Sequence, residues 1–393
     1  MLAHPFEDAN PVIKAIKNQG YTAYYVGGCI RDYLLKQETN DIDIATSALP
    51  EDIQKIFEKV IPVGVDHGTV LVRYNHVSYE VTTYKSIINQ FNKNVSYDIK
   101  DDLAKRDFTI NALAMDEQGE IIDMYDGESD IKNKLIRAVG LPDDRLNEDP
   151  LRIIRALRFS SQLNFEIETD TLKSMMKLKH KISLLSVERI TTEMNKFFTG
   201  KNLDKGLKYL LQTKIYTELP IFKSNKDLIK SLPSKLKPFN RFSEVISFFY
   251  MIDNRISINE WIKSWKLSNE TKKESVNLTK ALTSYNESGI NAMLLYKLET
   301  DLIKSFVYVA NLYFKANLKV INIVDQKNAL PITSRQELNI NGNDITKLYP
   351  QLKKGKWIED VLSSVEKEVL NRRLHNDNNT IKEWIKCNRL EIN

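Results

Sequence analysis

The sequence predicts an α+β protein in which an N-terminal head, built from a small β-sheet and helices, is followed by an extended all-α region. Over residues 1–138 helix-type and strand-type hydrophobic patterns alternate, whereas strand signals almost vanish from Asp149 onward. The 393 residues, 42% hydrophobic and 28% charged, suffice for two or three domains with sizeable cores. We expect four parts, which are a head at 1–140, a helical neck at 141–199, a helical body at 200–305 and a helical tail at 306–393.

Each element of the head has a signal of its own. Amphipathic spacing predicts three helices, at Pro11–Gln19, Arg31–Lys36 and Pro50–Val60. Alternating apolar residues predict strands at Ala23–Val26, Asp41–Ala45, Thr69–Tyr74, Val77–Thr83, Ile110–Asp116 and Ile121–Met124. Turn residues at Asn75-His76 and Gln118-Gly119 join the last four of these strands in pairs. In the helical region the helices are separated by Pro220, Pro233, Pro238, Pro331, Pro350, Gly200 and Gly342.

Charge is distributed unevenly along the chain. The net charge is +5, but residues 1–200 carry −6 and residues 201–393 carry +11. This asymmetry favours an acidic catalytic half and a basic half that holds a polyanion. The alternative is that the lysines only solvate the surface of a helical protein.

Composition also excludes several classes of protein. The longest apolar runs are too short for a bilayer span, and Met1–Asn10 lacks the basic and apolar regions of a signal peptide. We therefore expect a cytoplasmic protein without a membrane partner. The two cysteines, Cys29 and Cys387, suggest neither a disulfide framework nor a zinc site. Five scattered histidines show no metal-ligand spacing.

The first candidate site combines a glycine pair with two acids. Gly27-Gly28 stands between a predicted strand and a predicted helix, where it lets the backbone approach a phosphate chain. Asp41 and Asp43 are spaced i, i+2, so they emerge on one face of a strand. Two such carboxylates repel each other unless a cation lies between them, and carboxylate oxygens suit Mg²⁺. Taken singly, the glycine pair is more typical of a turn and the acid pair of a solvated strand end.

Two further segments carry candidate site residues. Glu80, in an alternating strand, could support the acid pair or could simply bond to a neighbouring loop. Farther along, a spacing of three places four charged residues on one helix stripe beside an apolar face. These residues are Asp149, Arg152, Arg155 and Arg158. Pro150 fits the first helical position and Asp149 its N-cap. A stripe of this kind is commonly only solvated surface.

The motifs in this order resemble a known family. The run GGCIRDYLL…NDIDIATSALPEDI resembles motif A of the class II branch of polymerase-β-like nucleotidyltransferases, which holds CCA-adding enzymes and bacterial poly(A) polymerases. Leu103–Ala112 resembles motif B, with Lys105 in place of its first arginine, and Asp126–Gly140 resembles motif C. Asn147–Phe159 resembles the nucleotide-selecting motif D, and Ser186–Glu193 resembles motif E. The stretch Leu330–Asp344 resembles the tail of Gram-positive-type CCA-adding enzymes.

The resemblance implies a role for each candidate residue. Asp41 and Asp43 would hold Mg²⁺ and be catalytic, and Gly28 and Arg31 would cradle the triphosphate. Arg106 would contact the incoming nucleotide, with Asp107 and Asn111 shaping the site. Arg155 and Arg158 would face the triphosphate or brace Arg152. Asp126 and Arg137 would join head to neck, and motif E, with Arg189 and Glu193 at i, i+4, would be scaffold.

Motif D also has a direct chemical interpretation. A carboxylate only accepts hydrogen bonds and a guanidinium only donates them. Asp149 can therefore accept the amino group of cytosine or adenine while Arg152 donates to the neighbouring ring nitrogen. Uracil and guanine present the opposite order, and each mismatched buried group costs roughly 1–3 kcal/mol. The pair would admit CTP and ATP and exclude UTP and GTP.

The resemblance implies addition and repair of the 3′-terminal CCA of tRNA from CTP and ATP, without a template and with release of pyrophosphate. The neck would select nucleotides, and body and tail would hold the acceptor stem and T-arm; a homodimer is one candidate assembly. One departure leaves an alternative open, since the loop Ser86–Asp102 lacks the arginine and proline that the family carries there. A CC-adding enzyme is therefore one alternative. A bacterial poly(A) polymerase is a second alternative, which the tail match and the lack of a strongly basic C-terminal extension disfavour. A silent RNA-binding relative is disfavoured by the intact motifs.

Overall fold

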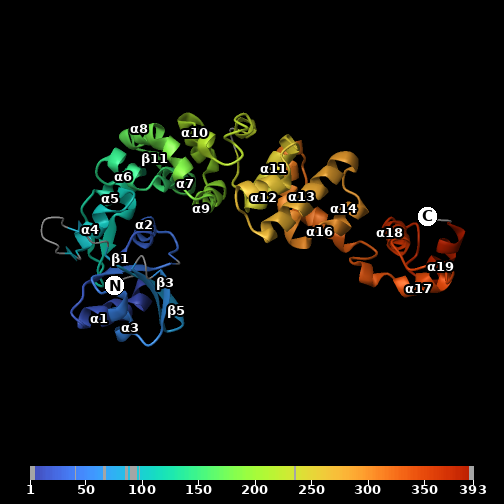
Figure 1. Cartoon of the computed structure of the whole chain (residues 1–393), viewed down its shortest axis with the longest axis horizontal. Helices are drawn as coiled ribbons and strands as arrows, with labels where there is room; N and C mark the ends of the chain where they lie inside the picture. Colours follow the sequence, from blue (N-terminus) through green and yellow to red (C-terminus); the bar gives the residue numbers. More distant parts are fainter. Residues whose placement is uncertain are drawn as a thin grey trace. The chain divides into compact units, whose positions relative to one another are not determined.

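The computed structural model describes residues 5–39, 41–64, 68–84, 98–233 and 236–388, and the backbone of 87–88 and 95–96. The chain forms two compact units, an N-terminal unit of Met1–Pro238 and a C-terminal unit of Phe239–Asn393 (Figure 1). The boundaries predicted at 140, 199 and 305 stay predictions. No helix among the described residues is long and apolar enough to cross a membrane.

A seven-stranded sheet forms the head, in the order β3-β4-β5-β2-β1-β8-β9. Only the β2–β5 pair is parallel among these neighbours, and it places Asp43 beside Glu80. The strands are β1 (Ala23–Val26), β2 (Asp43–Thr46), β3 (Val60–Gly64), β4 (Thr69–Tyr74), β5 (Val77–Thr83), β8 (Leu113–Met115) and β9 (Ile121–Asp123). Two further short strands, β6 (Ile87–Ile88) and β7 (Val95–Ser96), pair with each other.

Among the described residues of the head, five α-helices accompany the sheet: α1 (Phe6–Asn18), α2 (Gly28–Leu34), α3 (Pro50–Ile56), α4 (Ile99–Ala104) and α5 (Gly127–Lys132). Burial of apolar residues holds them in place. The apolar face of α1 is buried, and the Tyr25 hydroxyl donates to the carbonyl oxygen of Phe6 at 2.9 Å. Ile99 and Leu103 of α4 are buried in a cluster with Val26 and Ala114.

The predicted hairpin of Thr69–Tyr74 and Val77–Thr83 is confirmed at both ends. The helix predicted from Pro50 to Val60 is wrong at its end, because α3 stops at Ile56 and Val60 begins β3. Val60 pairs with Val72, so sheet pairing outweighs the local helical pattern at this edge. The second predicted strand is also shifted: β2 starts at Asp43 rather than at Asp41.

Helices follow the head within the N-terminal unit: α6 (Pro142–Glu148), α7 (Leu151–Leu163), α8 (Thr169–Leu178) and α9 (Val187–Phe198), which fall in the predicted neck, and α10 (Leu203–Thr213), which falls in the predicted body. The head is tied to them by parallel pairing of β10 (Leu135–Ile136) with β11 (Glu166–Ile167). Helix α10 approaches α7 closely, since a Cβ on Gly206 would lie 2.8 Å from the Ser161 side chain. The absence of a side chain at Gly206 therefore permits this packing.

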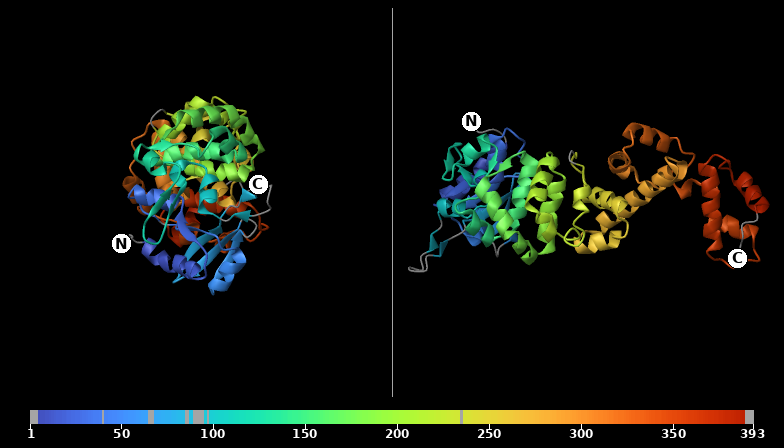
Figure 2. Two further views of the ribbon diagram at one scale, coloured as in Figure 1. Left: turned by 90° about the vertical axis from the view of Figure 1, so that its left-hand side faces the viewer. Right: turned by 90° about the horizontal axis from the view of Figure 1, so that it is seen from above.

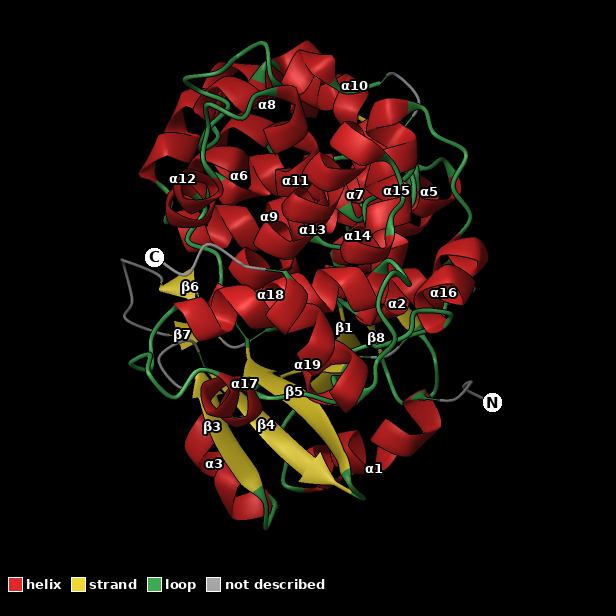
Figure 3. Ribbon diagram, turned by 90° about the vertical axis from the view of Figure 1, so that its right-hand side faces the viewer, coloured by secondary structure: helices red, strands yellow, loops and turns green. Residues whose placement is uncertain are grey.

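The described residues of the C-terminal unit form helices and connecting loops without a strand, as the sequence predicts (Figures 2 and 3). Aromatic packing organises its first part, where Phe249 of α11 stacks on Trp261 of α12 at 5.7 Å. A separate apolar cluster around Ile345, Val365 and Ile381 forms the core of its last three helices. The helices are α11 (Phe242–Ile252), α12 (Ile258–Ser264), α13 (Asn269–Ser288), α14 (Ala292–Lys297), α15 (Ile303–Phe314), α16 (Val320–Asn328), α17 (Gly342–Leu348), α18 (Trp357–Leu370) and α19 (Asn378–Cys387).

Candidate active site

The structure brings the predicted acids together at the start of β2. Asp43 is the first residue of this strand and lies in register with Glu80 of β5. Asp41 precedes the strand and is exposed, so the prediction that both aspartates lie within it is wrong. Burial raises the pKa of Asp43 to about 6, with Glu80 and Asp41 adding to the rise and Arg106 opposing it. The acids are therefore close enough to act on one another's charge.

The donor set is compatible with a divalent cation. Asp41 and Asp43 together provide hard carboxylate oxygens, and the pKa of Asp43 is raised first by burial and then by the charges of Glu80 and Asp41. Among the described residues no group of three or more acidic, histidine or cysteine side chains is arranged to hold a metal. Two carboxylates are nevertheless enough for Mg²⁺, which commonly takes its other ligands from water and substrate phosphates.

The glycine pair lies next to two arginines. Gly27 has a φ of +78°, and a Cβ there would lie 2.6 Å from the Arg106 guanidinium. A Cβ on Gly28 would lie 3.5 Å from the guanidinium of Arg31. Gly27 is thus required twice, by its backbone conformation and by the close approach of Arg106.

Arg31 belongs to a buried polar chain that links the head to the neck. Its Nη1 donates to Asn111 at 2.6 Å, and the amide nitrogen of Asn111 donates to Asp107 at 3.0 Å. Asp107 also accepts from Arg155 of α7 at 2.7 Å. Contacts with Arg155, Asn111 and the Phe108 amide outweigh burial and lower the pKa of Asp107. Motif B therefore fastens α7 to the head.

Asp149 lies between α6 and α7, where its two carboxylate oxygens have different partners. Oδ1 accepts from the Leu151 amide at 3.2 Å, and Oδ2 accepts from Arg189 of α9 at 2.8 Å. Helix α7 begins at Leu151 with Pro150 as N-cap, one residue later than predicted. Pro150 has helical backbone angles, yet the first hydrogen bonds assigned to the helix form after it.

Arg152 is held by the protein but keeps donors free. Its Nη1 donates to the Arg145 carbonyl at 2.8 Å and to Glu148 at 3.0 Å, and its Nη2 donates to the Lys105 carbonyl at 2.8 Å. A guanidinium has five N–H donors, so Nε and one hydrogen on Nη2 have no partner among the described residues. The contact with Lys105 anchors the neck arginine to motif B of the head.

Arg155 and Arg158 converge on Glu193 of α9. The Arg155–Glu193 and Arg158–Glu193 distances are 3.6 and 3.2 Å. Arg158 is only 7% exposed, and burial lowers its pKa to about 10. Both guanidiniums, together with that of Arg31, lie within 5.5 Å of the Phe159 ring. The arginine-rich side of α7 is thus a charged core that joins α7, α9 and the head.

Asp126 and Arg137, which were expected to join head to neck, both lie near Asp130 of α5. Arg137 donates to Asp130 at 2.9 Å, whereas its distance to Asp126 is 4.0 Å. Asp130 rather than Asp126 is therefore the main partner of Arg137. Asp126 itself stands at the start of α5 in a left-handed conformation.

The sequence did not predict the contacts of several residues in the site. Asp102 binds Arg106 from four positions upstream, a spacing that patterns along a helix could have revealed. Arg189 and Glu193 were assigned to scaffold, but they bind Asp149 and the arginines of α7. These contacts span up to 40 positions along the chain, and no local signal predicts them.

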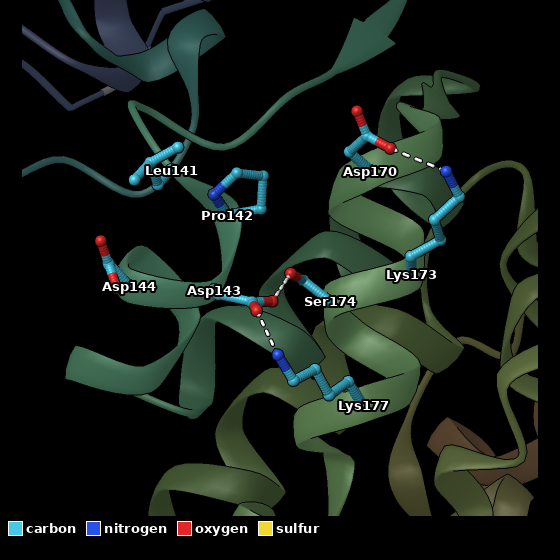
Figure 4. Close-up of a pocket in the computed structure, with 8 residues that line it drawn as sticks. All are labelled: Leu141, Pro142, Asp143, Asp144, Asp170, Lys173, Ser174 and Lys177. Atoms are coloured by element: carbon cyan, nitrogen blue, oxygen red, sulfur yellow. Dashed lines mark hydrogen bonds and ion pairs between the residues drawn. The ribbon is translucent and has the colours of Figure 1, made fainter.

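A surface hollow of about 540 Å³ lies elsewhere in the neck, between α6 and α8 (Figure 4). Charged side chains that line the hollow bond to one another. Asp143 accepts from Lys177 and Ser174, and Asp170 pairs with Lys173. None of the predicted site residues lines it. We therefore place the candidate active site at β2 and α7 rather than in this hollow.

Known proteins resemble the chain over its full length. A CCA-adding enzyme of Oceanobacillus iheyensis is 42% identical over 400 residues and is covered completely, as is this chain. The Bacillus stearothermophilus CCA-adding enzyme in complex with CTP matches with a TM-score of 0.88 at 31% identity, over 98% of each chain. A Thermotoga maritima CCA-adding enzyme complexed with tRNA shares the fold at 20% identity, with a TM-score of 0.65 over 97% of this chain and 95% of that one.

Three family models also match in succession. "Poly A polymerase head domain" covers 23–137, "Probable RNA and SrmB- binding site of polymerase A" covers 164–226, and tRNA nucleotidyltransferase domain 2 covers 240–385. The fold and its acid-bearing sheet are those of a polymerase-β-like nucleotidyltransferase. Within that class, the chain belongs to the family of CCA-adding enzymes.

Proposed function

We propose that this chain adds and repairs the 3′-terminal CCA of tRNA in the cytoplasm, using CTP and ATP without a nucleic-acid template and releasing pyrophosphate. The observation that carries the proposal is the full-length, 42% identical match to a CCA-adding enzyme. The placement of the predicted acids and the motif D residues in one unit supports it.

Asp41 and Asp43 are the proposed ligands of Mg²⁺. When bound, the metal lowers the pKa of the primer 3′-hydroxyl and stabilises charge on the departing pyrophosphate. The protein contributes the position of the two carboxylates, which the β2–β5 pairing sets for Asp43. Glu80 supports the site through its charge on Asp43 rather than as a required ligand.

The triphosphate is the proposed partner of Arg106 and of the Gly28 backbone. Arg106 lies near Asp43, and the absence of a side chain at Gly27 makes room for its guanidinium. Arg31 is 9% exposed and held by Asn111 and Asp32. We therefore propose that it stabilises the Gly27-Gly28 turn. Transfer of a nucleotidyl group needs mainly this positioning and charge neutralisation.

Base selection is the proposed task of Asp149 and Arg152. Each carboxylate oxygen of Asp149 has one protein partner and retains a second acceptor position. Arg152 retains Nε–H and one Nη2 hydrogen as donors. One acceptor beside one donor matches cytosine and adenine and opposes uracil and guanine. Arg155 and Arg158 hold α7 in place through Asp107 and Glu193, which fixes the spacing of the pair.

The proposed partner of the basic half is tRNA. A solved relative is a CCA-adding enzyme complexed with tRNA, and the residues from 201 to 393 carry a net charge of +11. Phosphate contacts of this kind give affinity without sequence readout. A homodimer stays a prediction.

In the loop Ser86–Asp102, which raised the CC-adding alternative, residues 86, 89–94 and 97 lie outside the described residues. Incubation with tRNA that lacks CCA, together with labelled CTP and ATP, tests the whole proposal. We expect three added nucleotides in the order C, C, A. Arrest after two would favour the CC-adding alternative, a long run of A would favour a poly(A) polymerase, and no extension would favour a silent binder.

A further inference from the structure

Asp102 lies beside the site without a role in the reaction as described so far. It is 4% exposed, on a helix whose apolar residues Ile99 and Leu103 are buried in the head core. Its Oδ2 accepts from both Nε and Nη2 of Arg106, at 3.1 and 2.9 Å. A rigidly placed carboxylate thus holds one whole edge of the guanidinium.

The other edge of Arg106 faces the glycine turn. Nη1 approaches the position that a Cβ on Gly27 would occupy to 2.6 Å, and its contact with the Asn111 carbonyl is long, at 3.5 Å. Because Asp102 uses Nε and one hydrogen of Nη2, the Nη1/Nη2 edge keeps its donors. Two parallel N–H groups on one edge are the arrangement that binds phosphate oxygens in a bidentate way.

A competing attraction acts on Arg106. The guanidinium lies close enough to Asp43 to lower the pKa of that carboxyl, and Glu80 and Asp41 stand nearby. Without Asp102, these acids would be the main negative charges acting on Arg106 and would draw it toward the metal ligands. Asp102 competes with this attraction through the two hydrogen bonds that it accepts from Nε and Nη2 of Arg106.

We propose that Asp102 is a positioning residue that aligns Arg106 for the nucleotide triphosphate, and this inference rests on the proposed function. Asp102 touches neither base nor phosphate; it orders a guanidinium that would otherwise sample several rotamers or pair with the catalytic acids. Its effect is therefore the same for CTP and ATP and leaves base choice unchanged.

The experiment measures equilibrium binding of CTP and of ATP to the full chain without tRNA, by calorimetry. Asp102→Asn should weaken both nucleotides by roughly tenfold, the order expected from ordering one long side chain. The preference for CTP over UTP and the KM for tRNA should not change. Asp101→Asn is the matched control, since it removes a charge from the same helix and is not a partner of Arg106 among the described residues.

A double-mutant cycle with Arg106→Ala separates positioning from general support of the fold. If Asp102 acts through Arg106, adding Asp102→Asn to Arg106→Ala should weaken nucleotide binding no further. An equal loss in both backgrounds would overturn the proposal. So would unchanged or tighter binding in Asp102→Asn, since tighter binding would mean that Asp102 merely neutralises Arg106.

The variant Asp102→Glu and tRNA extension by the wild-type chain provide two further tests. If Asp102→Asn does not fold, Asp102→Glu keeps the charge but displaces the carboxylate, and we expect a smaller loss of nucleotide binding with wild-type stability. Wild-type affinity in a folded Asp102→Glu would contradict positioning. Failure of the wild-type chain to extend tRNA would contradict the proposed function. The double-mutant cycle of nucleotide binding would still test the role of Asp102 separately.

Discussion

At the scale of single residues, the site is defined by an imbalance of charge. Three acids stand near one another at the start of β2, and the pKa of Asp43 rises to about 6 because it is buried beside Glu80 and Asp41. Such an arrangement is unfavourable in the absence of a cation, and it is retained where a cation is part of the chemistry.

The roles of the three acids are separable by substitution. Asp43→Asn should lower kcat by about a thousandfold or more, because metal stabilisation of developing charge contributes several kcal/mol. Glu80→Gln should cost no more than about tenfold, since its influence on Asp43 is electrostatic. Steady-state CTP incorporation measures both variants, and a loss in Glu80→Gln as large as that in Asp43→Asn would make Glu80 an essential ligand.

Local patterns located most of the candidate residues but not their partners. The i, i+2 spacing of the aspartates was visible in the sequence, although only Asp43 lies within β2. The three-residue spacing on α7 was visible because the helix period places such residues together. The Asp149–Arg189 contact joins two helices through 40 positions of chain, so only tertiary packing reveals it. Arg155 and Arg158 followed the predicted stripe, yet their partners Asp107 and Glu193 were not assigned.

At the scale of elements, the start of α2 is the most constrained turn. Gly27 combines a φ of +78° with the close approach of Arg106, whereas Gly140 has a φ of +70° with nothing near its missing Cβ. The two glycines therefore share a positive φ, which would strain any other residue, but differ in their surroundings.

Replacement of each glycine by alanine tests this difference. Both variants should lose about 1–3 kcal/mol of stability, because a side chain is strained at positive φ. Only Gly27→Ala should also weaken binding of CTP and ATP, since its Cβ displaces Arg106. Calorimetric titration measures the binding, and equal affinities for the two variants would show that the Arg106 contact is unimportant.

The α7–α9 contact is the second element-scale feature. Glu193 is 6% exposed and neutralises Arg158, although neither Arg158 Nε nor Glu193 Oε2 has a well-formed hydrogen bond. Glu193→Gln should lower the free energy of unfolding by about 3–5 kcal/mol, because it leaves a buried guanidinium unpaired. Chemical denaturation measures this loss. The double variant Glu193→Leu with Arg158→Met should recover most of it; no recovery would assign the loss to packing.

The sequence predicted the types of helices and strands better than it predicted where they begin and end. The β4–β5 hairpin matches its prediction because a two-residue turn and alternating side chains specify it locally. Strand β3 was missed because Val60–Gly64 follows a helix without a turn signal and gains its partners only from β4. The first helix starts at Phe6, ahead of the predicted Pro11, because its apolar face is buried. Pro11 therefore lies inside the helix, where it lacks the N–H that would bond to the preceding turn.

At the scale of the whole molecule, chemistry and charge are divided between parts of the chain. The candidate active site lies within the N-terminal unit, while the net positive charge lies after residue 200. Within the C-terminal unit, Lys353, Lys354 and Lys356 are exposed together just before or at the start of α18.

Replacement of these three lysines by glutamate should therefore weaken tRNA binding without changing nucleotide binding. We expect the KM for tRNA to rise by tenfold or more and the salt dependence of tRNA binding to become shallower, because fewer phosphates are neutralised. Nucleotide binding without tRNA serves as the control and should be unchanged. An unaltered KM for tRNA would exclude this stretch from the tRNA interface.

In the proposed reaction, Asp149 and Arg152 recognise the base while Asp41 and Asp43 hold the metal. The most direct test is the ratio of kcat/KM for CTP to that for UTP in the variant Asp149→Ala with Arg152→Ala. We predict that the ratio falls by tenfold or more toward unity, since roughly 1–3 kcal/mol of mismatch per group is removed. A ratio equal to that of the wild-type chain would contradict the account.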